Sequence, residues 1–123
     1  MYDKFLTIEL LRRIETSLKE IIDWTVHVKS VEDFLLSSDG MILLNAVCMK
    51  LIVVGEDVKT LDKYTNKTLL PKYHTIQWKD IMGMRDVIAH HYFDLEADKI
   101  FDTVKEEVPE LLNVIIKMKH DFT

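Results

Sequence analysis

The sequence predicts an all-α protein, a bundle of four to five helices running mostly up and down. Apolar residues recur at spacings of three and four along most of the 123-residue chain, as on the buried face of an α-helix. No stretch alternates apolar and polar residues as a half-buried strand does. Only three glycines and two prolines interrupt the helical pattern. A chain of this length fits one domain of ordinary size, so we expect a single helical domain over residues 1–123.

The first helix is predicted over residues 2–27, where the apolar face is formed by Phe5, Ile8, Leu11, Ile14 and Leu18. A short segment, SVEDFLLS, then begins at Ser30, with Asp33 three residues on as its capping partner. Ser38 or Asp39 is expected to cap the next helix. That helix extends to about Tyr64 and would be about 40 Å long at the standard rise per residue.

The first half of this long helix, Met41–Val54, is apolar nearly all round. Such a helix either lies centrally in a bundle or is covered by a second chain. Its β-branched residues allow a buried strand as an alternative, which the absence of a partner strand in the sequence disfavours. Cys48 is the only cysteine, so no intramolecular disulfide can form, and a buried thiol is expected.

The second half of the chain is predicted to hold one irregular connection and three helices. Residues 65–75 contain Pro71 and form the connection. Thr75 would cap a helix ending near His91, and Asp94 would cap another over about 95–107. Pro109 suits the first turn of a last helix, 108–121.

Charge and hydropathy narrow the classes of function. The net charge is −5, which argues against wide non-specific binding to nucleic acid, DNA included. Residues 59–91 nevertheless carry six basic and three acidic residues, so this part of the chain is compatible with binding an anionic ligand. The N-terminus does not resemble a signal peptide, and the longest apolar run falls short of the roughly 20 residues that span a membrane. We therefore expect a cytoplasmic protein without a membrane partner.

A candidate site lies in GMRDVIAHHY, residues 83–92. On one continuous helix the side chains of Arg85 and His90 would point about 140° apart. They could converge if the helix ends at His90 or if a second chain completes a cleft. Asp86 and His90 are four residues apart, so a carboxylate could hold the imidazole's tautomer there.

These residue types suit metal-independent RNA cleavage. An imidazole can transfer a proton near neutral pH, and a guanidinium can bind phosphate through two parallel hydrogen bonds. Simpler interpretations stay open: His90 could complement the helix dipole, Arg85 could form a surface ion pair, and Gly83 could serve helix packing. A metal site is disfavoured because no third ligand accompanies Asp86 and His90, and neither HExxH nor CxxC occurs. No cofactor is expected.

The pattern Arg85-x4-His90-x-Tyr92 resembles the Arg-x4-His-x-Tyr signature of HEPN domains (higher eukaryotes and prokaryotes nucleotide-binding), in particular the HepT-like toxins. The surrounding stretches 76–111 and VVGEDVKTL, 53–61, resemble the same family. The resemblance implies an all-α homodimer with the motif at the dimer interface. It also implies a metal-independent endoribonuclease that acts as the toxin of a toxin–antitoxin pair.

Carried over by position, the resemblance makes Arg85 and His90 catalytic. Tyr92 becomes the tyrosine to which a cognate minimal nucleotidyltransferase antitoxin adds AMP, silencing cleavage of the RNA substrate. Asp86 and Gly83 take supporting roles. Glu56 matches a recurrent acidic residue of the family, for which a structural or polar-network role is as compatible as a catalytic one.

Two other classes of function remain open on the sequence alone. The bundle could be a non-catalytic substrate-binding or scaffold partner of a nucleotidyltransferase. It could also be a structural helical dimer in which the motif only packs.

Overall fold

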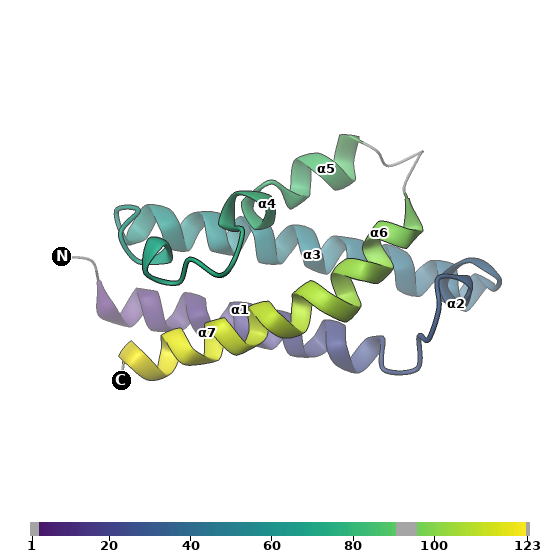
Figure 1. Cartoon of the computed structure of the whole chain (residues 1–123), viewed down its shortest axis with the longest axis horizontal. Helices are drawn as coiled ribbons and strands as arrows, with labels where there is room; N and C mark the ends of the chain where they lie inside the picture. The colour runs from purple at the N-terminus through teal and green to yellow at the C-terminus, as the bar shows by residue number, and fades with distance from the viewer. Residues whose placement is uncertain (1–2, 91–95, 123) are drawn as a thin grey trace.

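The computed structural model describes residues 3–90 and 96–122, with His90 described by its backbone alone, and within them it is all-α without strands (Figure 1). The fold class predicted from the sequence is confirmed. The elements in chain order are α1 (Lys4–Trp24), α2 (Glu32–Leu35), α3 (Ser38–Tyr64), the 3₁₀ turn η1 (Leu70–Lys72), α4 (Trp78–Met82), α5 (Met84–His90), α6 (Ala97–Asp102), the π-helical turn η2 (Thr103–Glu107) and α7 (Val108–Phe122).

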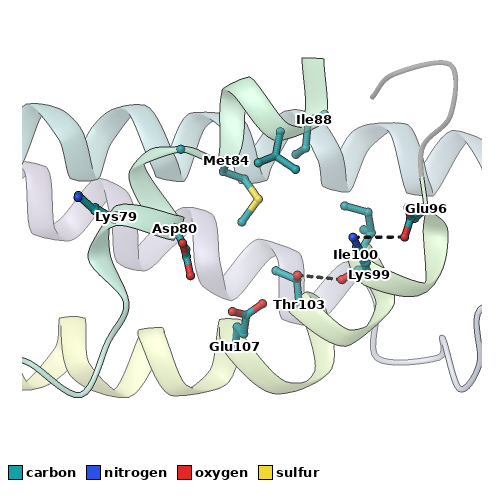
Figure 2. A pocket seen from close by; sticks show the side chains of 11 residues that line it. Lys79, Asp80, Met84, Ile88, Glu96, Lys99, Ile100, Thr103 and Glu107 are labelled. Atoms are coloured by element: carbon teal, nitrogen blue, oxygen red, sulfur yellow. Dashed lines mark hydrogen bonds and ion pairs between the residues drawn. The ribbon is translucent and has the colours of Figure 1, made fainter. Parts of the chain in front are cut away.

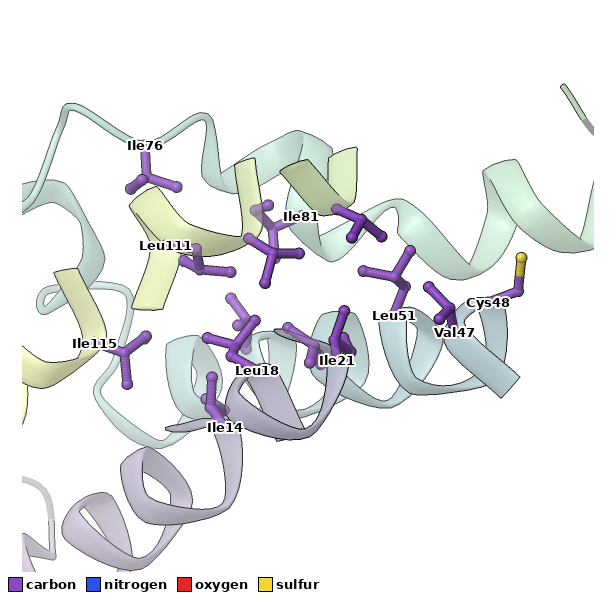
Figure 3. Close-up of a cluster of buried hydrophobic side chains, with 14 of the residues drawn as sticks. Ile14, Leu18, Ile21, Val47, Cys48, Leu51, Ile76, Ile81, Leu111 and Ile115 are labelled. Atoms are coloured by element: carbon purple, nitrogen blue, oxygen red, sulfur yellow. The ribbon is translucent and has the colours of Figure 1, made fainter. Parts of the chain in front are cut away.

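Three long helices, α1, α3 and α7, form the body of the bundle, and α4 and α5 pack on α3 (Figure 1). Their inward residues follow the spacing of three and four that the sequence shows. Fully buried apolar side chains on these helices include Leu11, Ile14, Leu18 and Ile21 on α1, Val47, Val58 and Leu61 on α3, and Ile115 and Met118 on α7. Figure 3 shows Ile14, Leu18, Ile21, Val47 and Ile115 among the residues of this core. Burial of this apolar surface is the main stabilising term of the fold.

The helix ends differ in detail from the prediction. Asp3 caps α1 by accepting from the Leu6 amide at 3.1 Å, and α1 ends at Trp24 rather than at residue 27. Ser37, not Ser38 or Asp39, caps α3, because its hydroxyl accepts from the Gly40 amide at 2.9 Å. The expected role of Asp33 is confirmed, since its carboxylate accepts from the Ser30 amide at 3.3 Å.

The prediction of a single helix over 75–91 is wrong in two respects, because the helix begins later and is interrupted in its middle. Residues 65–77 are irregular apart from η1, and the indole of Trp78 donates to the Tyr73 carbonyl at 2.9 Å, so helix begins only at Trp78. At Gly83 the helix breaks, separating α4 from α5. The backbone of Gly83 (φ −86°, ψ 1°) is no longer helical, and its amide donates to the Lys79 carbonyl at 2.9 Å.

The two helices expected over 95–107 and 108–121 are one continuous helical path from α6 through η2 to α7. Pro109 has no amide hydrogen, and in an α-helix its ring would crowd the carbonyl of Lys105. A π-helical turn widens the backbone just before it, with the Val108 amide bonding to the Thr103 carbonyl. The helix therefore accommodates Pro109 by forming a π-bulge and continues past it, so Pro109 does not start a new helix. The predicted cap Asp94 lies outside the described residues.

Helix α3 occupies the central position that one of the two sequence interpretations required, since it contacts α1, α2, α4 and α5. Burial raises the pKa of the Cys48 thiol to about 11, in agreement with a thiol that acts as a small apolar group. In the part of the chain described here, no helix combines the length and the hydropathy needed to cross a bilayer.

Candidate functional site

The candidate site begins at the contact between α3 and the α4–α5 corner. Gly55 of α3 is buried there, and a Cβ on it would stand 2.6 Å from the Ile81 carbonyl oxygen and 3.4 Å from the Met84 Cβ. Only glycine allows the two backbones to approach this closely. A glycine inside a helix costs about 1 kcal/mol relative to alanine, so the close contact explains its presence.

The next residue on α3, Glu56, meets the motif arginine. The Arg85 guanidinium donates to the Glu56 carboxylate with a nitrogen–oxygen distance of 3.4 Å. The second oxygen of Glu56 lies 3.4 Å from the Lys59 ammonium, one turn along α3. Arg85 keeps 62% of its side chain exposed, so the ion pair orients the guanidinium and leaves it accessible to a ligand.

The break at Gly83 determines how α5 leaves this corner. The Gly83 carbonyl accepts from the Val87 amide at 3.1 Å and so starts α5 directly after α4 ends. Asp86 lies in the first turn of α5 and is exposed. A carboxylate there also complements the positive end of the helix dipole.

The remaining predicted site residues are only partly placed. His90 is the last residue of α5, and its predicted role and its pairing with Asp86 stay predictions. Tyr92 lies outside the described residues. The structure thus brings together Arg85 and Glu56, two residues that only the family resemblance had connected.

Sequence reasoning missed a second ion pair next to the site. Asp57 is buried on α3, and Arg13 of α1 donates to its carboxylate at 2.9 Å. Burial raises the pKa of Asp57, and the nearby positive charge of Arg13 opposes that effect. The sequence did show that Asp57 is a charged residue on the buried side of an otherwise apolar helix, which indicates a buried ion pair. It did not identify Arg13 as the partner, because Arg13 is 44 residues away in the chain.

An exposed apolar surface leads along α3 toward Glu56. Ile42 is 67% exposed and Met49 is 61% exposed, and on α5 Val87 is 55% exposed. Ile42, Met49 and Glu56 are each seven residues apart, so they share one face of α3. The apolar stretch Met41–Val54 therefore packs into the bundle on one side of α3 and is exposed to solvent on the other.

The described residues contain no group of three or more histidine, cysteine, aspartate or glutamate side chains that could hold a metal ion. The carboxylate that contacts Arg85, that of Glu56, is paired with the cations of Arg85 and Lys59. The arrangement offers a guanidinium on an exposed helix, backed by a carboxylate, to an anionic ligand.

Comparison with protein families matches residues 11–118 of the chain to the family described as "HepT-like: Ribonuclease HepT-like". A protein of Caldanaerobacter subterraneus subsp. tengcongensis named "Putative RNase" is 37% identical over 82 residues, 67% of each chain. A "Probable ribonuclease HepT" of Thermococcus cleftensis is 29% identical over 111 residues, which cover 90% of this chain and 94% of the relative.

A Methanocaldococcus jannaschii protein named "Gamma-glutamylcyclotransferase and putative RNase" is 28% identical over 102 residues, 83% of this chain. The match spans only 43% of that relative's length. No solved structure matches the chain.

Proposed function

The chain belongs to the HepT-like ribonuclease family, and from that premise we propose that it is a metal-independent endoribonuclease. One observation carries the proposal. Arg85 is held on the exposed side of α5 by Glu56, 3.4 Å away, in the position where a guanidinium can bind an RNA phosphate. The sequence context of Arg85 matches the Arg-x4-His-x-Tyr pattern, with His90 ending the same helix.

In the proposed reaction the ribose 2′-hydroxyl attacks the adjacent phosphorus. The new bond joins the 2′-oxygen to phosphorus, and the bond from phosphorus to the 5′-oxygen of the next nucleotide breaks. His90 accepts the proton of the attacking 2′-hydroxyl and returns a proton to the departing 5′-oxygen, and Arg85 stabilises the negative charge that grows on the phosphoryl oxygens. The products are a 2′,3′-cyclic phosphate and a 5′-hydroxyl end.

We further propose that the active form is a homodimer built on the exposed apolar face of α3. Uncovered Ile42 and Met49 give that face a hydrophobic surface beyond what scattered surface residues provide. The face continues to Glu56 and so to Arg85. A second copy seated there would bring its own Arg85 close to the first and complete a cleft for RNA.

The proposal includes a cellular role as the toxin of a toxin–antitoxin pair, acting in the cytoplasm. A cognate minimal nucleotidyltransferase would add AMP to Tyr92, seven residues beyond Arg85 in the sequence. The adduct is bulky and anionic, so it would exclude RNA and occupy the guanidinium. This role rests on the family pattern in the sequence.

The test is an RNA cleavage assay in EDTA with the unmodified protein, whose mass first shows that Tyr92 carries no AMP. We expect cleavage with 2′,3′-cyclic phosphate ends, lost in Arg85→Ala and in His90→Ala, while Lys63→Ala on the same basic stretch retains it. Circular dichroism establishes that each variant folds.

Cleavage that survives both motif substitutions would overturn the assignment of Arg85 and His90. No cleavage by the folded, unmodified wild type, together with tight binding to a nucleotidyltransferase that stays active, would favour the scaffold alternative.

A further inference from the structure

A cavity of about 630 Å³ separates α4 and α5 from α6 and η2 (Figure 2). Its volume falls within the range of about 300–1,000 Å³ that is usual for small-ligand sites. The wall on the motif side is made by Gly83, Met84, Val87 and Ile88, the residues that flank Arg85 on both sides. The opposite wall comes from Ile100, Thr103 and Glu107.

The cavity combines apolar walls with two carboxylates that face one space. Figure 2 shows Met84, Ile88 and Ile100 lining it, with the carboxyl groups of Asp80 and Glu107 pointing into it from α4 and η2. The other acid at its edge, Glu96, is paired with Lys99 at 3.4 Å. Within residues 3–90 and 96–122, neither the Asp80 nor the Glu107 carboxylate has an ion-pair or hydrogen-bond partner, and both residues are exposed to solvent.

The π-helical turn η2 contributes to this arrangement. Thr103 and Glu107 are its first and last residues, and both line the cavity. A π-helical turn shifts the direction of the side chains that follow it relative to a regular α-helix, and such turns occur frequently at functional sites. Glu106 and Glu107 are both exposed to solvent, but only Glu107 lines the cavity, so the turn directs one of two adjacent acids toward it.

We propose that this cavity binds a nucleobase of the RNA strand whose phosphate Arg85 holds, with a preference for bases that donate amino hydrogens, guanine above all. The inference rests on the function proposed above and adds base specificity to it. Of the two lysines on the lining, Lys99 is paired with Glu96, and Figure 2 shows Lys79 pointing away from Asp80 and Glu107. The two carboxylates repel the phosphates of RNA, so they favour a neutral base over the backbone as the occupant. They accept hydrogen bonds only, and guanine presents two adjacent donors, N1–H and the 2-amino group, to a single carboxylate.

Uracil fits the same walls poorly. Its one ring N–H lies between two carbonyl oxygens, which a carboxylate repels. The apolar side chains Met84 and Ile88 suit the face of an unstacked base in a single strand, the form in which RNA sequence is usually read. Arg85 lies on another face of the same short helix, whose diameter with side chains is about 10–12 Å. A short stretch of single-stranded RNA can span that distance from the Arg85 side to the cavity.

The experiment titrates the intact protein with guanosine, inosine and uridine and follows amide chemical shifts by NMR. Nucleosides carry no phosphate, so Arg85 does not contribute to their binding. We expect guanosine to bind at least tenfold more tightly than uridine, with inosine, which lacks the 2-amino group, between them. Asp80→Asn with Glu107→Gln should abolish the preference, and the matched control Glu106→Gln should keep it.

Equal binding of the three nucleosides, no guanosine binding at millimolar concentration, or a preference that survives the double substitution would overturn the inference. A second assay cleaves oligoribonucleotides with guanosine or uridine at one position of an otherwise constant strand. If Arg85→Ala abolishes cleavage but the double variant cleaves with the same base preference as the wild type, the cavity inference is overturned. The proposed nuclease activity would stand in that case. Selective guanosine binding by a wild type that cleaves no RNA would support the cavity and overturn the nuclease.

Discussion

Gly55 of α3 lies so close to Ile81 of α4 that a Cβ on Gly55 would stand 2.6 Å from the Ile81 carbonyl oxygen. The obstacle is backbone, which cannot rotate away as a flexible side chain can. This contact brings the end of α4 against α3 one residue before Glu56. It therefore determines where the backbone of Arg85 lies relative to the Glu56 carboxylate that its guanidinium contacts.

Gly55→Ala is expected to destabilise the fold and to disturb the site together. Overpacking of this kind costs about 1–3 kcal/mol, which a lower urea midpoint would report. The matched control is Gly83→Ala, where a Cβ would meet the Lys79 carbonyl oxygen at 3.2 Å and φ is already negative, at −86°. Its cost should stay below about 1 kcal/mol. Equal stability of the Gly55→Ala variant and the wild type would contradict the close packing of α3 on α4.

Glu56→Gln is expected to reduce RNA cleavage while leaving the fold almost unchanged. The Arg85 ion pair is largely exposed, so its loss should cost less than about 1 kcal/mol of stability. Loss of its orienting effect on Arg85 should lower kcat about tenfold, which corresponds to about 1.4 kcal/mol in the barrier. Lys59→Gln removes the other partner of Glu56 and should leave kcat within about twofold. A Glu56→Gln variant with wild-type kcat would show that Glu56 does not position Arg85.

The parts of the structure that could be predicted from the sequence depend on local physics. The spacing of three and four in Leu11, Ile14 and Leu18 follows from helix geometry, and these residues are buried as that spacing requires. The irregular segment around Pro71 was recognisable because proline breaks a helix. Arg85 was a candidate because of its motif and Glu56 because of the family resemblance. The structure places their side chains in contact, and their roles stay predictions.

The parts that could not be predicted depend on tertiary contacts. Proline lies in an irregular segment at Pro71, but at Pro109 it lies in a helix that continues from α6 to α7 through a π-helical turn. The break at Gly83 depends on how α4 packs against Gly55, and no local pattern contains that contact. The Arg13–Asp57 pair joins two helices 44 residues apart in sequence.

Met49→Glu is expected to convert the proposed dimer into a monomer. Met49 is 61% exposed on the apolar face of α3, so a carboxylate there costs the monomer little but would be buried without a partner at the interface. Sedimentation velocity would show the change in mass. Val26→Glu, at a 65% exposed position near the end of α1, is the control and should leave the mass unchanged. A wild type that is monomeric at high micromolar concentration would refute the dimer.

Asp57→Asn is expected to raise the free energy of unfolding at pH 7 by about 1 kcal/mol, as replacement of a buried charge can. Burial raises the pKa of Asp57 above its ordinary value of 3.8, so its ionised form is less favourable in the folded state than in the unfolded state. At neutral pH the charge therefore costs stability, and this cost disappears as the pH falls and the carboxyl is protonated. Arg13→Ala removes the opposing charge and should destabilise instead. Urea titrations at pH 7 check both signs, and a destabilised Asp57→Asn variant would mean that the ion pair outweighs burial.

Glu15 should make the fold sensitive to acid, because it joins α1 to α7. Its carboxylate oxygens lie 2.7 Å from the Lys119 ammonium and 2.7 Å from that of Lys19. Hydrogen bonds from Lys119 and then Lys19 lower the pKa of Glu15 below its ordinary value of 4.5.

A lowered pKa means that the ionised form stabilises the folded state. That stability is present above pH 4.5 and is lost as the pH falls through the lower folded-state pKa. We expect Glu15→Gln to lose about 1–2 kcal/mol at pH 7, and the gap to the wild type to close in acid. Glu9→Gln, which breaks an exposed pair with Arg12, should cost less than about 0.5 kcal/mol at any pH. A gap for Glu15→Gln that stays constant from neutral pH into acid would trace its effect to packing, because only a titrating charge loses its contribution when it is protonated.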